Sequence, residues 1–96
     1  MSYARINSMT FSSEKAADTM QAKYSSTAPK WFPEAELLTF VRTSPLTASL
    51  TSIYPNKAAF DRSVEERTRR LKENEGMIES VETQEGEVTL VHVNKD

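Results

Sequence analysis

Residues 35–43, with the sequence AELLTFVRT, limit the folds available to this chain more than any other segment. Successive side chains of a β-strand point to opposite faces, so Leu38 and Phe40 share one face while Leu37 and Val41 share the other. A strand with apolar side chains on both faces is buried on both. The segment therefore predicts a sheet that packs against helices on one side and against a second protein layer on the other.

The rest of the sequence predicts three more strands and two helices. We expect the strands at residues 3–11, 46–54 and 88–93, from their alternating apolar side chains. We expect the helices at residues 13–26 and 56–74, where apolar side chains recur every three or four positions. A short Ser-Pro connection separates the AELLTFVRT segment from the strand that follows it, which predicts a hairpin.

The first helix has a defined start and an abrupt end in the sequence. Ser12 or Ser13 can cap it by accepting a hydrogen bond from an N–H of the first turn. Pro29 and Pro33 bracket the next three residues, and proline disfavours a helix both at its own position and at the residue before it. We therefore expect residues 30–32 to form a turn or a short irregular segment.

The second helix is expected to start at the cap Asn56 and to end before Gly76 in the left-handed conformation. Its inner face should carry Ala59, Phe60, Val64 and Leu71. Its outer face should carry two favourably ordered i,i+4 ion pairs, Glu65–Arg69 and Glu66–Arg70. Gly86 predicts a bulge or turn between a short piece of strand and the final strand.

In chain order these elements read β-α-β-β-α-β, the arrangement of a ferredoxin-like sheet with both helices on one face. The chain has 96 residues, two glycines and no low-complexity tract, which predicts a single α+β domain over residues 1–96. A domain of this size has little core of its own. The apolar side chains on the helix-free face therefore predict a homodimer.

Charge and residue types exclude several functions. The net charge of −2 gives no electrostatic basis for binding nucleic acid or an anionic membrane. The basic residues of 67–72 have glutamates on both sides, at 65, 66, 73 and 75, as on a solvated helix face. Without cysteine, and with one histidine that has no carboxylate at ligand spacing, no metal site is expected. No segment fits a signal peptide or could span a bilayer, so we expect a cytoplasmic location.

The segment SLTSIYPNKAAFDRSVEERTRRL, residues 49–71, is a strand that runs into a capped helix with Ala59-Phe60 just after the cap. Together with the element order and the chain length, it resembles the dimeric α+β barrel superfamily, and within it the antibiotic-biosynthesis-monooxygenase type. The resemblance implies a homodimer whose two sheets face each other as a barrel. Relatives of this architecture include oxygenases, haem-degrading enzymes, isomerases, decarboxylases and proteins with no known reaction.

Some enzymes of this type oxidise polycyclic phenols without a cofactor or metal. Haem-degrading members use an Asn on the first strand, a Trp, and a His on the second helix. Asn7 matches that Asn, but Trp31 precedes the second strand instead of taking the place of that Trp, and the second helix contains no histidine. The resemblance therefore implies neither haem nor another cofactor here.

Two residues are candidates for catalysis. Asn7 either orients a substrate carbonyl or bound dioxygen, or is a polar residue on a half-buried strand. His92, the only histidine, is expected on the final strand with Val88 and Leu90. There it is either a general base near neutral pH or a packing residue at the sheet edge.

Four residues are candidates for contacting a substrate. Trp31 and Phe32 either line the mouth of an apolar pocket or close one end of the core. Tyr54 has an amphipathic ring whose hydroxyl can reach a ligand from the edge of the core. Arg42 either binds an anionic substrate or pairs with a glutamate of the second subunit.

Two functions stay open from the sequence. The first is a cofactor-independent monooxygenase that acts on a small aromatic or quinol-like compound in a pocket between sheet and helices. The second is a non-catalytic homodimer that binds a small ligand or has a structural role. An enclosed pocket that brings Asn7, Trp31 or His92 together favours the enzyme, whereas a cavity filled by side chains favours the second function.

Overall fold

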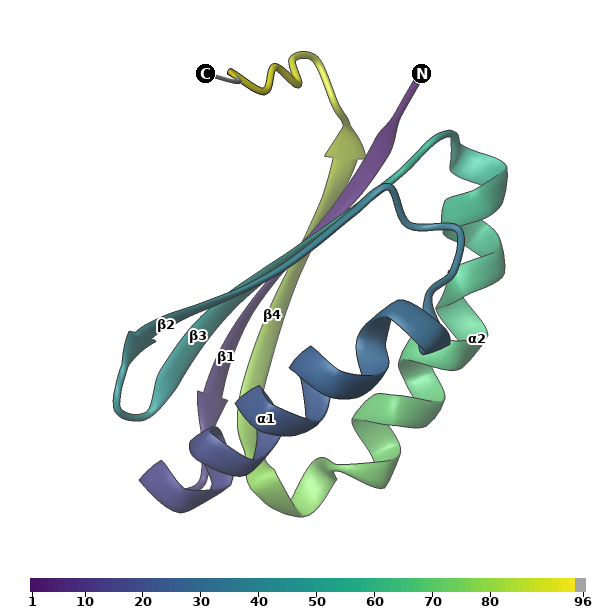
Figure 1. Ribbon diagram of the computed structural model, residues 1–96. Coiled ribbons are helices and arrows are strands. Elements are labelled where there is room, and N and C mark those ends of the chain that lie inside the picture. The colour runs from purple at the N-terminus through teal and green to yellow at the C-terminus, as the bar shows by residue number, and fades with distance from the viewer. Residues whose placement is uncertain (95–96) are drawn as a thin grey trace.

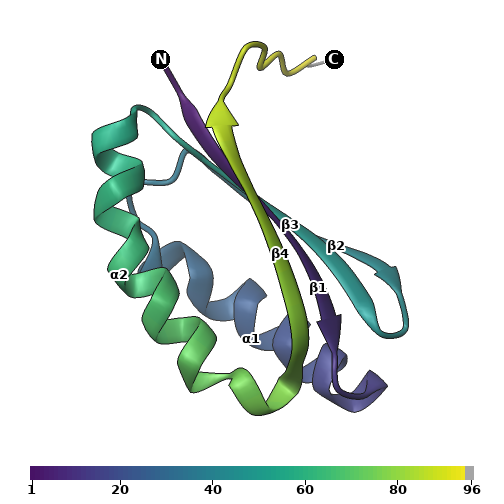
Figure 2. The ribbon, with the colours of Figure 1, turned by 180° about the vertical axis from the view of Figure 1, so that it is seen from behind.

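The computed structural model describes residues 1–94, which form an antiparallel sheet with two helices packed on one face (Figure 1, Figure 2). The elements follow in the order β1 (Tyr3–Phe11), α1 (Glu14–Trp31), β2 (Leu37–Ser44), β3 (Thr47–Tyr54), α2 (Lys57–Glu73), the 3₁₀-helix η1 (Glu75–Met77) and β4 (Ile78–Glu87). The strands pair in the order β2-β3-β1-β4. The predicted α+β, ferredoxin-like β-α-β-β-α-β architecture is confirmed.

None of the helices within residues 1–94 combines the length and the apolar character needed to cross a membrane.

β1 and β3 form the centre of the sheet and alternate between its two faces. Every second residue of β3 is buried under the helices: Ala48, Leu50, Ser52 and Tyr54. On β1, Met9 and Phe11 are buried on the same side, whereas Ile6 on the opposite face is 41% exposed. The core therefore lies between the sheet and the helices, as the alternation of residues 3–11 predicts.

β2 has apolar side chains on both faces, as predicted. Phe40 faces the helices, and its ring centre lies 6.3 Å from that of Phe11 and 5.7 Å from that of Tyr24. Leu37 and Val41 lie on the helix-free face and are 38% and 54% exposed. The helix-free face thus presents apolar surface that a second layer can cover.

Both helices start at predicted caps. Ser13 Oγ accepts a hydrogen bond from the Ala16 N–H at 3.0 Å in α1. Asn56 Oδ1 accepts one from the Ala59 N–H at 2.8 Å in α2. Each cap satisfies an N–H that has no partner inside its helix, which fixes the residue where the helix begins.

α1 is longer than predicted and continues through Pro29 to Trp31. Proline removes one hydrogen bond from the helix, but the ladder resumes where the Phe32 N–H donates to the Ala28 carbonyl at 2.9 Å. The predicted turn is wrong because tertiary contacts hold the residues beyond the proline. Phe32 is buried, and the Trp31 ring packs against the guanidinium of Arg70 on α2.

The end of α2 differs from the prediction. The backbone N–H and the side-chain amide of Asn74 both donate to the Arg70 carbonyl, at 3.2 and 2.7 Å. This pair of bonds closes the helix without a left-handed residue. Gly76 lies in η1, and no glycine of the described chain has a positive φ.

The inner face of α2 is more polar than predicted. Ala59 and Phe60 are buried as expected, but Val64 is 41% exposed and Ser63 is buried instead. Arg67 follows one helical turn after Ser63 and therefore lies on the same face. The face that α2 turns toward the sheet thus carries a hydroxyl and a guanidinium where a continuous apolar stripe is expected.

β4 lies earlier in the chain than predicted. It pairs with β1 along its length and ends at Glu87, opposite Tyr3. Gly86 lies inside this ladder opposite Ala4 and forms no bulge. The predicted strand at residues 88–93 is wrong. β1 begins at Tyr3, opposite Glu87, so residues 88–93 extend past the end of β1, and no other strand of the described residues lies beside them.

Candidate functional site

A cavity of about 60 Å³ lies between the helix-covered face of the sheet and the two helices. Apolar and aromatic side chains form most of its wall: Met9, Met20, Tyr24, Trp31, Phe32, Leu50 and Leu71. Apart from Ser52, the polar side chains fall into two groups. We call Arg5, Asn7, Tyr54 and Arg67 the floor, and Lys23, Arg70 and Asn74 the rim.

Arg5 on β1 is the most deeply buried charge of the floor, with 2% of the side chain exposed. Its Nη2 donates to Ser63 Oγ at 3.2 Å, and its guanidinium carbon lies 4.4 Å from the centre of the Phe60 ring. The carboxylate of Glu85 on β4 lies 3.7 Å from Nε, which is too far for a hydrogen bond. Arg5 Nε therefore has no hydrogen-bond partner within residues 1–94.

Arg67 on α2 fixes the side chain of Asn7. Its Nη2 donates to Asn7 Oδ1 at 3.0 Å and to Thr83 Oγ1 at 2.5 Å, and the Thr83 hydroxyl donates to the same Asn7 oxygen at 2.8 Å. A guanidinium can only donate, so the amide oxygen of Asn7 must face it.

Arg67 is a poorly compensated charge. Burial, and then the nearby charge of Arg5, lower the pKa of Arg67 from its ordinary value. Its Nε has no hydrogen-bond partner in the described chain, and among the ion pairs of residues 1–94 none involves Arg67. The floor therefore contains two guanidinium groups that few protein atoms neutralise.

Two tyrosines add hydroxyl groups to the cavity. Tyr54 on β3 is 1% exposed, and its hydroxyl has no hydrogen-bond partner in the part of the chain that the structure describes. An unpaired buried hydroxyl costs about 1–3 kcal/mol, so a ligand that pairs with it is favoured. Burial, reinforced by Tyr54, raises the pKa of Tyr24 to about 12, which makes Tyr24 a neutral donor instead of a base at neutral pH.

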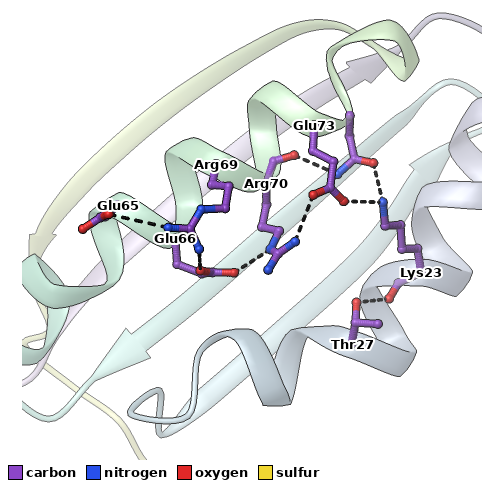
Figure 3. A network of polar contacts seen from close by, with 8 residues as sticks. Lys23, Thr27, Glu65, Glu66, Arg69, Arg70 and Glu73 are labelled. Atoms are coloured by element: carbon purple, nitrogen blue, oxygen red, sulfur yellow. Dashed lines mark hydrogen bonds and ion pairs between the residues drawn. The ribbon is translucent and has the colours of Figure 1, made fainter.

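At the rim, an ion pair between Lys23 and Glu73 connects the two helices, and further ion pairs lie along α2 (Figure 3). Lys23 of α1 donates to Glu73 at 3.0 Å and to Asn74 Oδ1 at 2.8 Å, and both acceptors lie at the C-terminal end of α2. Arg70 pairs with Glu66 and, at 3.0 Å, with Glu73. The hydrogen bond from Lys23 lowers the pKa of Glu73. Both rim cations therefore have carboxylate partners.

The ring of Trp31 lies near both rim cations. Its ring centre is 4.2 Å from the Arg70 guanidinium carbon and 5.9 Å from Lys23 Nζ, distances typical of cation–π contacts. The predicted pairs Glu65–Arg69 and Glu66–Arg70 are both present. Glu66, however, is only 20% exposed, because its pairing with Arg70 places it beside the rim and not on the outer face.

Four of the predicted site residues line the cavity: Asn7, Trp31, Phe32 and Tyr54. The structure thus brings together residues from β1, the end of α1 and β3 that lie far apart in sequence. Their roles in binding and catalysis stay predictions.

Arg42 and His92 lie outside the cavity. Arg42 on β2 contacts Asp18 and Gln21 of α1, each at 2.9 Å, so its guanidinium is engaged within its own subunit. The placement of His92 on a strand is wrong; the residue is exposed in the segment after β4, and its Nε2 lies 2.8 Å from Asn94 Oδ1. Within residues 1–94, no three acidic or histidine side chains are close enough together to hold a metal ion.

Neither Arg5 nor Arg67 was predicted as a site residue. The available signal for Arg5 is its position on the face of residues 3–11 that otherwise carries Met9 and Phe11. The signal for Arg67 is its spacing of seven residues from Phe60, two turns along the same helix face. The many charged residues around Arg67 hide that spacing.

No protein-family model matches this sequence, and no curated protein sequence matches it either. Solved structures match it over nearly the whole chain. A dimeric ferredoxin-like protein from an uncultured marine organism has a TM-score of 0.76 at 12% identity, with 98% of this chain and 93% of that chain covered.

Two other solved structures have oxygenase descriptions. SnoaB, a cofactor-independent oxygenase from Streptomyces nogalater, has a TM-score of 0.71 at 11% identity, covering 94% of this chain and 95% of its own. A protein from Bacteroides thetaiotaomicron assigned as an antibiotic biosynthesis monooxygenase has a TM-score of 0.73 at 12% identity, covering 99% and 96%. The chain has an antibiotic-biosynthesis-monooxygenase-like fold. At these identities the likeness concerns the fold, and the function has to be argued from the cavity.

Proposed function

We propose that this protein is a cofactor-independent monooxygenase that binds a small aromatic or quinol-like compound in the cavity between sheet and helices. The observation that carries the proposal is the composition of the cavity. Its wall contains the aromatic rings of Trp31 and Phe32, and its floor contains the buried guanidinium of Arg5 and the half-buried Arg67. The description of SnoaB, which shares the fold, supports the choice of reaction.

The charge of the floor fits the chemistry that such a reaction needs. An ionised phenol is electron-rich enough to react with dioxygen, and it supplies the electrons itself. One oxygen atom stays on the ring carbon as a carbonyl and the other leaves as water, while the substrate loses two hydrogens. Positive charges a few ångströms away lower the pKa of a bound phenol and so favour its ionised form.

Asn7 and Tyr54 are the groups that we expect to orient the substrate. The oxygen of Asn7 is held by Arg67 and Thr83, so its amide nitrogen is the part left to meet a ligand. The Tyr54 hydroxyl is buried and can donate a hydrogen bond to a substrate oxygen. Because the cavity wall, as described, contains no carboxylate and no histidine, we expect the substrate proton to leave to solvent.

We also propose that the protein acts as a homodimer through the helix-free face of the sheet. Ile6, Leu37 and Val41 expose apolar surface there, and a solved structure with the same fold is described as dimeric. Light scattering at micromolar concentration should give twice the mass of one chain. A monomer under these conditions would contradict the proposal.

A non-catalytic protein that binds a small ligand is the second candidate. The volume of the cavity favours it, because about 60 Å³ is far below the 300–1,000 Å³ of sites that hold drug-sized ligands. A polycyclic substrate therefore requires Trp31 or Phe32 to move. A single-ring compound requires less movement.

Oxygen uptake separates the two candidates. The purified protein, without added metal or cofactor, is incubated with 1-naphthol or 2,6-dimethylphenol under ¹⁸O₂. The enzyme should form the corresponding quinone with one labelled oxygen, and Tyr54→Phe should slow the reaction while Arg42→Gln, outside the cavity, should not. If these phenols bind but oxygen uptake does not exceed the protein-free rate, the protein is a binder and the oxygenase proposal fails.

A further inference from the structure

The buried side-chain atoms without partners are concentrated in one place. Within residues 1–94 there are three such atoms, Arg5 Nε, Arg67 Nε and the Tyr54 hydroxyl, and all three residues line the cavity. Buried polar groups in native proteins are nearly always hydrogen-bonded, so an unpaired group needs an explanation. Three unpaired groups in the wall of one small cavity point to a ligand that pairs with them.

The charge of the floor indicates the sign of the charge on that ligand. Arg5 and Arg67 contribute two positive charges, and the described carboxylate beside them is that of Glu85. Glu85 is 44% exposed and approaches Arg5 Nε only to 3.7 Å. The balance is therefore +2 − 1 = +1. A charge that is shielded from water and has no partner is unfavourable, so one additional negative charge is favoured at this site.

The geometry of the donors indicates the chemical group. Nη2 already donates to Ser63 in Arg5 and to Asn7 and Thr83 in Arg67, but Nε is unpaired in both arginines. The two oxygens of one carboxylate can therefore accept a hydrogen bond from each of the two Nε atoms. A phenolate offers one oxygen instead of two, and a phosphate dianion carries more charge than the net +1 of the floor. The rest of the wall is apolar and aromatic, so the remainder of the ligand is an apolar ring.

We propose that Arg5, Arg67 and Tyr54 bind the carboxylate of a small aromatic acid, which makes a hydroxylated aromatic carboxylic acid the substrate class. The assignment of a substrate rests on the oxygenase function proposed above, whereas the carboxylate site itself does not. Binding can therefore be measured without turnover.

Calorimetric titration with benzoate and with its neutral isostere benzamide tests the site. The wild-type protein should bind benzoate at least about tenfold more tightly than benzamide, because only benzoate supplies the charge. Tyr54→Phe should weaken benzoate binding about tenfold, and Arg67→Gln should abolish it. Arg42→Gln is the matched control, since Arg42 is an arginine of the same sheet outside the cavity, and it should bind benzoate as the wild type does.

Tyr54→Phe removes no hydrogen bond from the described chain, so this variant should fold even if Arg67→Gln does not. Equal binding of benzoate and benzamide, or unchanged benzoate binding by Tyr54→Phe, would overturn the carboxylate site. Benzoate binding without oxygen uptake on any phenol would leave the site standing and refute only the oxygenase. Oxygen uptake on 1-naphthol without benzoate binding would refute the carboxylate site and leave the oxygenase proposal standing.

Discussion

The rim and the floor of the cavity both contain two cations, but their surroundings differ. In the rim, Lys23 and Arg70 each contact carboxylates within hydrogen-bond distance, and the contact of Lys23 with Glu73 joins α1 to α2 (Figure 3). In the floor, Arg5 and Arg67 have one carboxylate beside them, that of Glu85, at 3.7 Å from Arg5 Nε. The rim is partly exposed to solvent, whereas Arg5 is almost fully buried.

The difference shows that the contribution of a cation to stability depends on whether the cation has a partner. Paired charges at a partly exposed rim stabilise the contact between the helices modestly. Unpaired charges in a buried floor lower stability and gain their partner from a ligand. Substitutions in the two groups should therefore change the free energy of unfolding in opposite directions.

The largest change in the free energy of unfolding is expected at Phe60, which packs against the floor. The Phe60 ring lies 4.8 Å from Tyr3, 5.8 Å from Tyr54 and 4.4 Å from the Arg5 guanidinium. Phe60→Ala should lower the free energy of unfolding by ~3–5 kcal/mol, through lost apolar burial and the cavity left behind. Small domains have about 5–15 kcal/mol in total, so urea denaturation should find the variant barely folded. A loss below about 1 kcal/mol would show that Phe60 does not anchor α2 to the sheet.

The rim is expected to show a smaller loss. Arg70→Met takes a partner from Glu66 and Glu73 and removes the cation that covers Trp31. Urea denaturation should show a decrease of about 1–2 kcal/mol. Arg69→Met is the control, because Arg69 is 56% exposed and its loss should change stability by less than about 0.5 kcal/mol. Equal effects of the two substitutions would mean that the rim does not hold the helices together.

Acid should weaken the rim before the floor. The pKa of Glu73 is lowered by its hydrogen bond with Lys23, so its contribution is present above the ordinary glutamate pKa and is lost as the pH falls through the lower folded-state value. The loss should therefore begin near pH 4 and continue below it, about where glutamates titrate. Glu73→Gln should flatten the dependence of the urea midpoint on pH in this range. If the urea midpoint of Glu73→Gln depends on pH as that of the wild type does, Glu73 is not the group whose lowered pKa causes this dependence.

The smallest effect, with the opposite sign, is expected from Tyr54→Phe. The substitution removes a buried hydroxyl that has no partner among residues 1–94 and keeps the ring in place. Without ligand, the free energy of unfolding should stay the same or rise by about 0.5–1 kcal/mol. A decrease of more than about 1 kcal/mol in urea denaturation would reveal a hydrogen bond of this hydroxyl within the protein.

Local signals in the sequence were sufficient for much of the fold. The cap Asn56 and the alternation of β1 depend on neighbouring residues only, so both could be predicted. The continuation of α1 through Pro29 could not, because the contact of Trp31 with Arg70 that supports it joins residues far apart in the chain. The position of β4 likewise depends on where β1 begins.

The site was predictable only in part, for a related reason. Aromatic and amide residues such as Asn7, Trp31 and Tyr54 stand out in the sequence and do line the cavity. An arginine within a run of mixed charges, such as Arg67, looks solvated until the helix is docked against the sheet. The register of α2, with Ser63 inside and not Val64, turns this arginine inward.

The most direct test compares Arg67→Met with the wild type, with and without saturating benzoate, by urea denaturation. If the floor holds an unpaired charge for a ligand, Arg67→Met should be at least as stable as the wild type without benzoate, since it removes a half-buried charge that has no carboxylate partner and leaves the Thr83–Asn7 hydrogen bond in place. Benzoate should then stabilise the wild type but not the variant. A variant that is less stable by more than about 2 kcal/mol, and that benzoate stabilises as much as the wild type, would contradict the account.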